Sequence, residues 1–169
     1  MTIAIQYNPK RSAEGKRSLR SLLFIINLNN TIMKYFTLKE LMHSNVALHN
    51  DIVNLPPHHE AGEIYFNLTV LVDNLLDRIR ERFAMQMIIT SGYRCEKLNK
   101  LVGGVDNSQH MKGEAVDFWF PGFSHKEMIE AFFEIAEEFD FDQLIYYKKK
   151  GIIHISYSRN NNRHQVIMR

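Results

Sequence analysis

The sequence contains very little cysteine. Its 169 residues include one cysteine, Cys95, so the chain can form no internal disulfide. The sequence therefore gives no sign of an oxidising compartment. We interpret Cys95, at the start of a predicted helix, as a small buried side chain rather than as a reactive thiol.

A large excess of one charge is also missing. The formal net charge is only +2, from 21 basic and 19 acidic residues, and this gives no reason to expect a nucleic-acid partner. The hydrophobic content of 45% and the length of 169 residues suit one domain with a sizeable core. We expect a monomer whose substrate choice depends on individual site residues.

Long hydrophobic runs are absent as well. The apolar stretch from Leu22 to Leu28 follows several basic residues but is much too short to span a membrane. It is at the lower limit for a secretory signal, and no Ala-x-Ala cleavage site follows it. We therefore interpret residues 1–32 as an N-terminal extension, flexible or the product of an upstream start, and not as a signal peptide.

The remaining sequence alternates between helical and strand patterns. Apolar residues at helical spacing predict a long helix over residues 58–83. Capping boxes predict helices that begin after Thr37 and Ser124, and Gly103 is expected to end a helix that begins at Glu96. The second capped helix is expected to bury Met128, Ile129, Phe132, Phe133, Ala136 and Phe139.

Four short apolar segments predict strands. They are residues 85–90, expected to lie centrally in a sheet, residues 115–120, the segment around 142–147, and residues 152–157. Together with the helices they predict one α+β domain, with a mostly antiparallel sheet that bears the site and helices flanking it.

Three residues have the chemistry of a metal site. His110 is followed seven positions later by Asp117, and His154 comes 37 positions after that. Two imidazoles and one carboxylate suit a catalytic zinc ion that keeps a fourth position open to water. Asp117 lies in an apolar strand, where an ionised carboxylate needs a partner or a cation.

Four ordered motifs carry a family resemblance. They are Ser91-Gly92-Tyr93-Arg94, the Ser-x-His-x-x-Gly-x-Ala-x-Asp pattern at 108–117, the run Phe141-Asp142-Gln143-Leu144-Ile145, and Ile153-His154-Ile155-Ser156. The chain resembles the zinc D-alanyl-D-alanine carboxypeptidase family. That family includes D-Ala-D-Ala dipeptidases and phage L-alanyl-D-glutamate endolysins, and it shares its fold with the Hedgehog signalling domain. The resemblance spans residues 33–169, which we predict to be a zinc peptidase domain.

The resemblance implies a role for each site residue. It makes His110, Asp117 and His154 the zinc ligands, while Arg94 holds a substrate carboxylate or carbonyl and Ser108 lines the substrate site. The implied activity is hydrolysis of peptidoglycan stem peptides during cell-wall recycling or lysis, by a bacterial or phage-encoded enzyme. D-Ala-D-Ala carboxypeptidase and L-Ala-D-Glu endopeptidase action both remain open.

The general base is the weak point of the resemblance. Many family members carry an acid three residues before the last histidine, where this chain has Gly151. We take Asp142 as the candidate base. However, a hairpin loop of residues 148–151 would place Ile145 opposite His154 and turn Asp142 away from it, and a one-residue change in loop length would reverse this.

The sequence leaves two questions open. Tyr147 and Glu114 are candidate bases besides Asp142. The chain could also be a zinc-retaining but catalytically weak domain that binds the cell wall. The lysine run at 148–150 is interpreted as a solvated hairpin tip, which could also attract an anionic wall.

Overall fold

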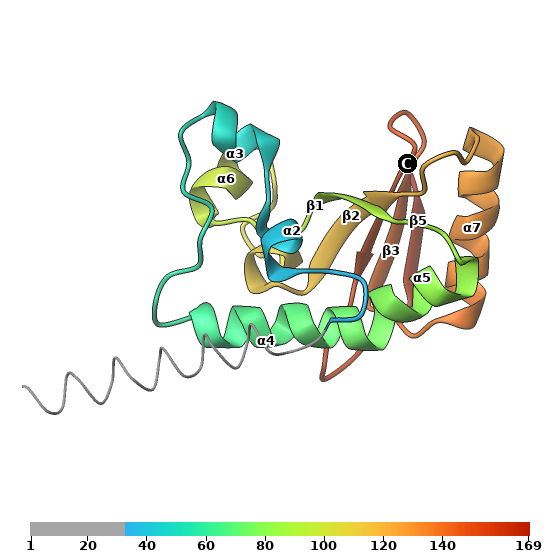
Figure 1. Cartoon of the computed structure of the whole chain (residues 1–169), viewed down its shortest axis with the longest axis horizontal. Coiled ribbons are helices and arrows are strands. Elements are labelled where there is room, and N and C mark those ends of the chain that lie inside the picture. The colour runs from blue at the N-terminus through green and yellow to red at the C-terminus, as the bar shows by residue number, and fades with distance from the viewer. Residues whose placement is uncertain (1–32) are drawn as a thin grey trace, which may run out of the picture. The chain divides into compact units, whose positions relative to one another are not determined.

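The computed structural model of the chain describes residues 33–169. The extension predicted at residues 1–32 lies outside the described residues. Residues 33–169 fold into a five-stranded sheet with helices, which confirms the predicted α+β class (Figure 1). No helix within this range combines the length and the apolar composition that crossing a membrane requires.

The elements follow one another along the chain in short segments. The helices are α2 (Leu38–Met42), α3 (Asn45–His49), α4 (Ala61–Leu71), α5 (Asp77–Phe83), α6 (Glu96–Leu101) and α7 (His125–Glu138). The strands are β1 (Ile88–Ser91), β2 (Ala115–Trp119), β3 (Gln143–Tyr147), β4 (Ile152–Ser156) and β5 (Gln165–Met168).

The sheet has the strand order β1-β2-β4-β3-β5, and it is mostly antiparallel, as predicted. Only β5 runs parallel to its neighbour β3. The prediction that the first strand is central was wrong, because β1 lies at an edge, pairs with β2 alone and loses register between Ile89 and Ser91. Strand β5 was not predicted. Its apolar run, Val166 to Met168, is shorter than the runs of about four to eight residues that indicate a strand.

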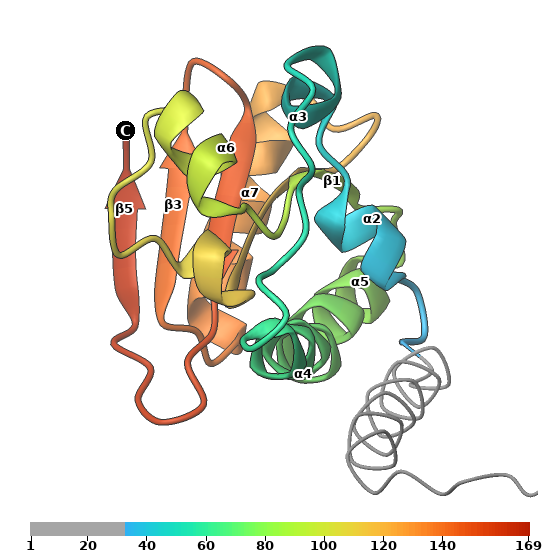
Figure 2. The same ribbon diagram turned by 90° about the vertical axis from the view of Figure 1, so that its left-hand side faces the viewer.

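The two faces of the sheet have different roles. Alternate side chains from the three middle strands point into the main core, where they meet α4, α5 and α7: Val116, Phe118, Leu144, Tyr146, Ile153 and Ile155. The opposite face carries Asp117 and His154. Helix α6 lies on that side, and α7 lies behind the sheet (Figure 2).

The long predicted helix is present, although it begins at Ala61 rather than at residue 58. Helices α4 and α5 are joined by a π-helical turn at Val72–Leu76. The expected apolar stripe is fully buried at Leu68, Leu71, Val72, Leu75, Leu76 and Ile79. The stripe therefore closes the core beneath the sheet.

The other helices match the predictions in part. The Ser124–Glu127 capping box opens α7, and Met128 and Phe132 are buried. The prediction that Phe133 is buried was wrong, since its side chain is 49% exposed. One residue adds about 100° of helical rotation, which carries Phe133 away from the face of Phe132. The segment after Thr37 forms two helices because Ser44 caps a second one, α3.

Gly92 occupies a tight crossing between β1 and α2. The Tyr93 amide donates to the Leu41 carbonyl at 2.8 Å, which brings the two backbones together. A Cβ atom at Gly92 would overlap the Leu41 carbonyl oxygen. The Gly92 carbonyl also lies 2.8 Å from His110 Nδ1, so this crossing positions a site residue.

We expect Gly92→Ala to lower the free energy of unfolding by about 3 kcal/mol or more, because the overlapping atoms are backbone and cannot yield cheaply. Gly151→Ala is the matched control. A Cβ there meets open space, so only the positive φ of 63° is unfavourable, at a cost of about 1 kcal/mol. Chemical denaturation measures both. Equal losses in the two variants would contradict the close crossing at Gly92.

Candidate metal centre

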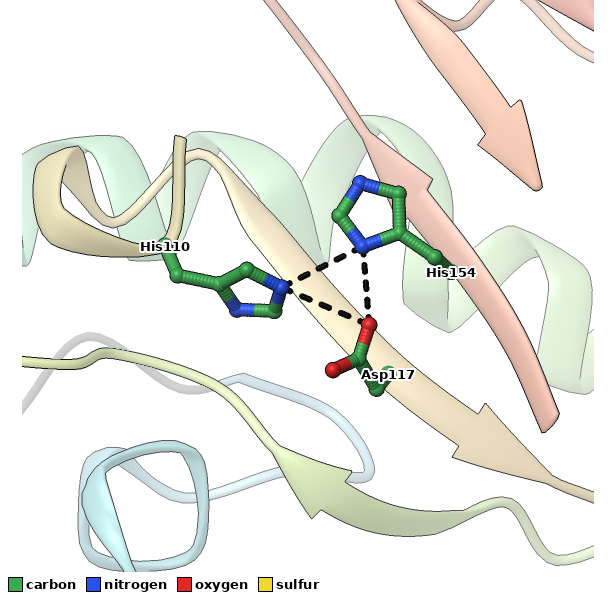
Figure 3. Close-up of side chains that lie close together, drawn as sticks. All are labelled: His110, Asp117 and His154. Atoms are coloured by element: carbon green, nitrogen blue, oxygen red, sulfur yellow. Dashed lines mark hydrogen bonds and ion pairs between the residues drawn. The ribbon is translucent and has the colours of Figure 1, made fainter. Parts of the chain in front are cut away.

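The structure brings His110, Asp117 and His154 together from three separate segments (Figure 3). His110 lies in a 3₁₀ turn (Gln109–Lys112), Asp117 lies in the middle of β2, and His154 in the middle of β4. Asp117 and His154 are direct partners in the β2–β4 register. The register therefore fixes two of the three side chains against each other.

The distances within this cluster suit a small cation. His154 Nδ1 lies 2.8 Å from Asp117 Oδ1 and 3.2 Å from His110 Nε2, and His110 Nε2 lies 3.3 Å from Asp117 Oδ1. Ligands of a tetrahedral zinc ion at 2.0–2.1 Å are separated by about 3.3 Å. Two of the three separations match this spacing, and the one between Asp117 and His154 is about 0.5 Å shorter.

The tautomer of His110 favours a ligand role. Its Nδ1 faces the Gly92 carbonyl at 2.8 Å, and a carbonyl can only accept, so Nδ1 carries the hydrogen. This leaves the lone pair on Nε2, which faces the cluster. Burial lowers the pKa of His110 below its usual 6.5, despite the nearby Asp117. The imidazole is therefore neutral, the form that binds metals.

Asp117 is held as a carboxylate. Burial by itself raises the pKa of Asp117, but its polar contacts within the cluster outweigh burial and keep the pKa well below the usual range. Its other oxygen, Oδ2, accepts from Arg94 Nη2 at 2.5 Å. One carboxylate and two imidazoles are a donor set that a divalent cation can bind.

Arg94 lies beside the cluster and is fixed by the protein. Besides its contact with Asp117, Arg94 Nε donates to Ser91 Oγ at 2.8 Å. The sequence predicted Arg94 as a substrate contact but missed both of these bonds. The Ser91-Gly92-Tyr93-Arg94 motif is thus a local unit in which Ser91 orients the arginine and Gly92 orients His110.

One groove of about 910 Å³ opens over the cluster. It is lined by all of the residues that the sequence singled out for the site: Arg94, Ser108, His110, Glu114, Asp117, Asp142, Tyr147 and His154. Gly151 does not line it. That residue lies in the β3–β4 turn and contributes to a second groove of about 500 Å³, together with Trp119 and His125. Its two neighbours, Lys150 and Ile152, line both grooves.

The β3–β4 hairpin has the register expected for a loop of residues 148–151, with Ile145 opposite His154, yet Asp142 lines the same groove as His154 rather than facing away from it. Asp142 is buried and holds Arg163 with both oxygens, at 2.7 Å to Nε and 2.6 Å to Nη2. These hydrogen bonds lower the pKa of Asp142. The sequence missed Arg163, which lies 21 residues away in a loop with no recognisable pattern.

Glu114 contrasts with Asp142 in the same groove. Its side chain is half-buried, and burial raises the pKa of its carboxyl, while the nearby Lys112 opposes this rise. A carboxyl with a raised pKa is a better proton acceptor than one that an arginine holds ionised. Glu114 is therefore better suited than Asp142 to accept a proton.

A groove built around two histidines and an aspartate is typical of metal-dependent hydrolases. The sequence profile of the Peptidase M15 family matches residues 34–156, well over half of the chain. The chain belongs to this family, which confirms the resemblance to zinc D-alanyl-D-alanine carboxypeptidases. Family membership indicates a hydrolase. No curated protein matches the chain.

The Asp142–Arg163 ion pair predicts a pH-dependent stability. The folded-state pKa of Asp142 lies below its ordinary 3.8, so the stabilisation is present above about pH 4 and is lost as the pH falls through the folded-state pKa. Asp142→Asn should lower the free energy of unfolding by about 1–3 kcal/mol at pH 7, and by less at pH 3.

The matched control is Asp140→Asn, two residues away on the exposed surface, which should change stability by less than about 0.5 kcal/mol. Urea denaturation at both pH values measures the difference. If the two variants were equally stable at pH 7, the ion pair would contribute nothing to the fold.

Proposed function

We propose that this chain is a zinc-dependent metallopeptidase that hydrolyses peptide bonds in peptidoglycan stem peptides. The observation that carries the proposal is the convergence of His110, Asp117 and His154 in the groove of a Peptidase M15 chain. Zinc bound by these three ligands would supply a Lewis acid for the scissile carbonyl and lower the pKa of water to about 7.

Arg94 and Ser108 are proposed to position the substrate. Arg94 uses Nε and Nη2 within the protein, and its Nη1 has no hydrogen-bond partner within residues 33–169. This nitrogen is available for a substrate carboxylate or carbonyl. Ser108 is buried in the groove wall, where it can border the bound peptide.

The general base is proposed to be Glu114, with Asp142 and Tyr147 as the alternatives. All three line the groove. A general base works best when its pKa is close to the working pH, which favours the raised carboxyl of Glu114 over Asp142. The contacts of Asp142 with Arg163 support a structural role for it instead.

A second function has one observation in its favour. Position 151 is a glycine, which carries no acid, and Arg163 holds the Asp142 carboxylate, so neither position supplies a free acid to the groove. This supports a zinc-retaining domain that binds cell-wall peptides and cleaves them weakly. Turnover of a defined substrate separates this function from the peptidase.

We expect purified protein to hold about one zinc ion per chain after reconstitution, because three ligands suffice for a catalytic site. His110→Ala and His154→Ala should lose the metal, and Asp117→Asn should weaken its binding because the neutral amide removes charge. His58→Ala, at an exposed position, is the matched control and should retain full zinc content. Elemental analysis of the dialysed proteins measures this. Equal zinc content in all variants would show that the three side chains do not bind the metal.

Digestion of purified muropeptides, followed by mass analysis, tests the reaction. Wild-type protein should release peptide fragments, and removal of the metal with a chelator should abolish this release. Glu114→Gln should lower turnover by about 10²-fold with zinc retained, the usual scale of general base catalysis, and Tyr147→Phe by much less. The test for Asp142→Asn is turnover at a temperature where this variant remains folded.

The outcomes separate the candidates. A large loss of turnover in Asp142→Asn, together with full activity in Glu114→Gln, would identify Asp142 as the general base. No fragment from any muropeptide, in a zinc-loaded and folded protein, would favour the binding domain over the peptidase.

A further inference from the structure

The backbone around Arg94 has no regular secondary structure. Residues 92–95 follow β1 and precede α6 but belong to neither element. The polar backbone groups of such a segment need partners from elsewhere in the fold. The Arg94 amide has one, because it donates to the His110 carbonyl at 3.1 Å. The Tyr93 carbonyl and the Cys95 amide, on either side of Arg94, have a side chain as their partner instead.

That side chain is Asn54, which spans Arg94 with a single amide group. Its Nδ2 donates to the Tyr93 carbonyl at 2.9 Å, and its Oδ1 accepts from the Cys95 amide at 2.8 Å. Nδ2 also donates to the Met42 carbonyl at 2.9 Å. Carbonyls can only accept and a backbone amide can only donate, so the orientation of the Asn54 side chain is fixed. One residue therefore holds the backbone on both sides of Arg94.

Asn54 is itself held in a well-anchored loop. Two residues earlier, Ile52 forms a small buried cluster with Ala47 of α3 and Leu98 of α6. Two residues later, Pro56 and Pro57 restrict the backbone. The loop is thus constrained on both sides of Asn54, which can transmit this constraint to the segment that carries Arg94.

The Arg94 side chain is fixed at its outer end by other residues. Its Nε donates to Ser91 Oγ at 2.8 Å, and its Nη2 donates to Asp117 Oδ2 at 2.5 Å. These two bonds have a defined geometry only if the backbone of Arg94 stays in place. A long side chain held at both ends has already lost its rotamer freedom before a ligand binds, which favours binding.

We infer that Asn54 is a positioning residue, which holds the backbone of Arg94 so that the guanidinium meets the substrate in a fixed orientation. The inference rests on the proposed role of Arg94 in substrate binding. A residue that merely supports the fold would act in the same way whether or not the guanidinium is present. A positioning residue acts through the guanidinium, and this difference can be measured.

Solvent exchange of the Arg94 Nε hydrogen tests the effect on the arginine directly. It is followed by NMR on the ¹⁵N-labelled, zinc-loaded full chain, and Arg94→Lys assigns the signal by removing it. Asn54→Ala should speed this exchange by about tenfold or more, because the Nε–H···Ser91 bond opens more often when the backbone is released. The increase should exceed that of the backbone amides of β2, which report opening of the whole fold.

Asn50→Ala is the matched control. Asn50 lies four residues earlier, and its side chain also donates to a backbone carbonyl, that of Val46 at 2.8 Å. This bond is local to α3 and does not touch residues 92–95. The exchange of the Arg94 Nε hydrogen in Asn50→Ala should therefore equal that in wild type.

A double-mutant cycle tests the effect on catalysis. For a muropeptide that the wild-type protein cleaves, Asn54→Ala should lower kcat/KM by about tenfold, with zinc content unchanged. In an Arg94→Ala background, the same substitution should lower kcat/KM by less than about twofold, because no guanidinium remains to be positioned.

The outcomes separate this inference from the proposed function. Unchanged Nε–H exchange in Asn54→Ala, or equal losses of kcat/KM in the two backgrounds, would overturn the positioning role. Loss of zinc in Asn54→Ala would overturn it too, since Asn54 would then act on the metal ligands. The exchange measurement needs no turnover. Faster exchange in a protein that cleaves no muropeptide would support the control of Arg94 by Asn54 and contradict the peptidase.

Discussion

The site depends on the antiparallel register between β2 and β4. Because Asp117 is paired with His154, the carboxylate and the imidazole meet on one face of the sheet, while Val116, Phe118, Ile153 and Ile155 enter the core from the other. A slip of one residue would turn every side chain of a strand to the opposite face. Such a slip would bury a charged group in the core and expose apolar ones. The packing that stabilises the fold therefore also fixes the metal ligands.

The third ligand is fixed by a different constraint. His110 belongs to no strand, and its orientation depends on the Gly92 carbonyl, which the close crossing of β1 and α2 places next to Nδ1. Arg94, two residues later, holds the remaining oxygen of Asp117. One short motif thus orients two groups of the site. The resulting cluster brings two ring nitrogens and a carboxylate oxygen around one point, a donor set that is well suited to a cation.

Much of this arrangement could be predicted from sequence because it follows local periodicity. The alternation in residues 115–120 and 152–157, the four-residue hairpin loop and the stripe of α4 and α5 all leave a local signal, and the structure has each of them. The edge position of β1, the exposure of Phe133 and the existence of β5 could not be predicted this way, since they depend on which elements pack next to one another. The same is true of Arg163, whose contact with Asp142 changes the expected base and arises only from tertiary structure.

The most direct test of the account is the location of the metal. Crystals of the zinc-loaded full chain, measured on both sides of the zinc absorption edge, give an anomalous difference map that identifies zinc and its ligands. We expect one site, bound by His110 Nε2, an Asp117 oxygen and His154 Nδ1, with a fourth position open to the groove. Zinc bound only by other histidines, such as His58 and His59, with the three side chains still hydrogen-bonded to one another, would contradict it.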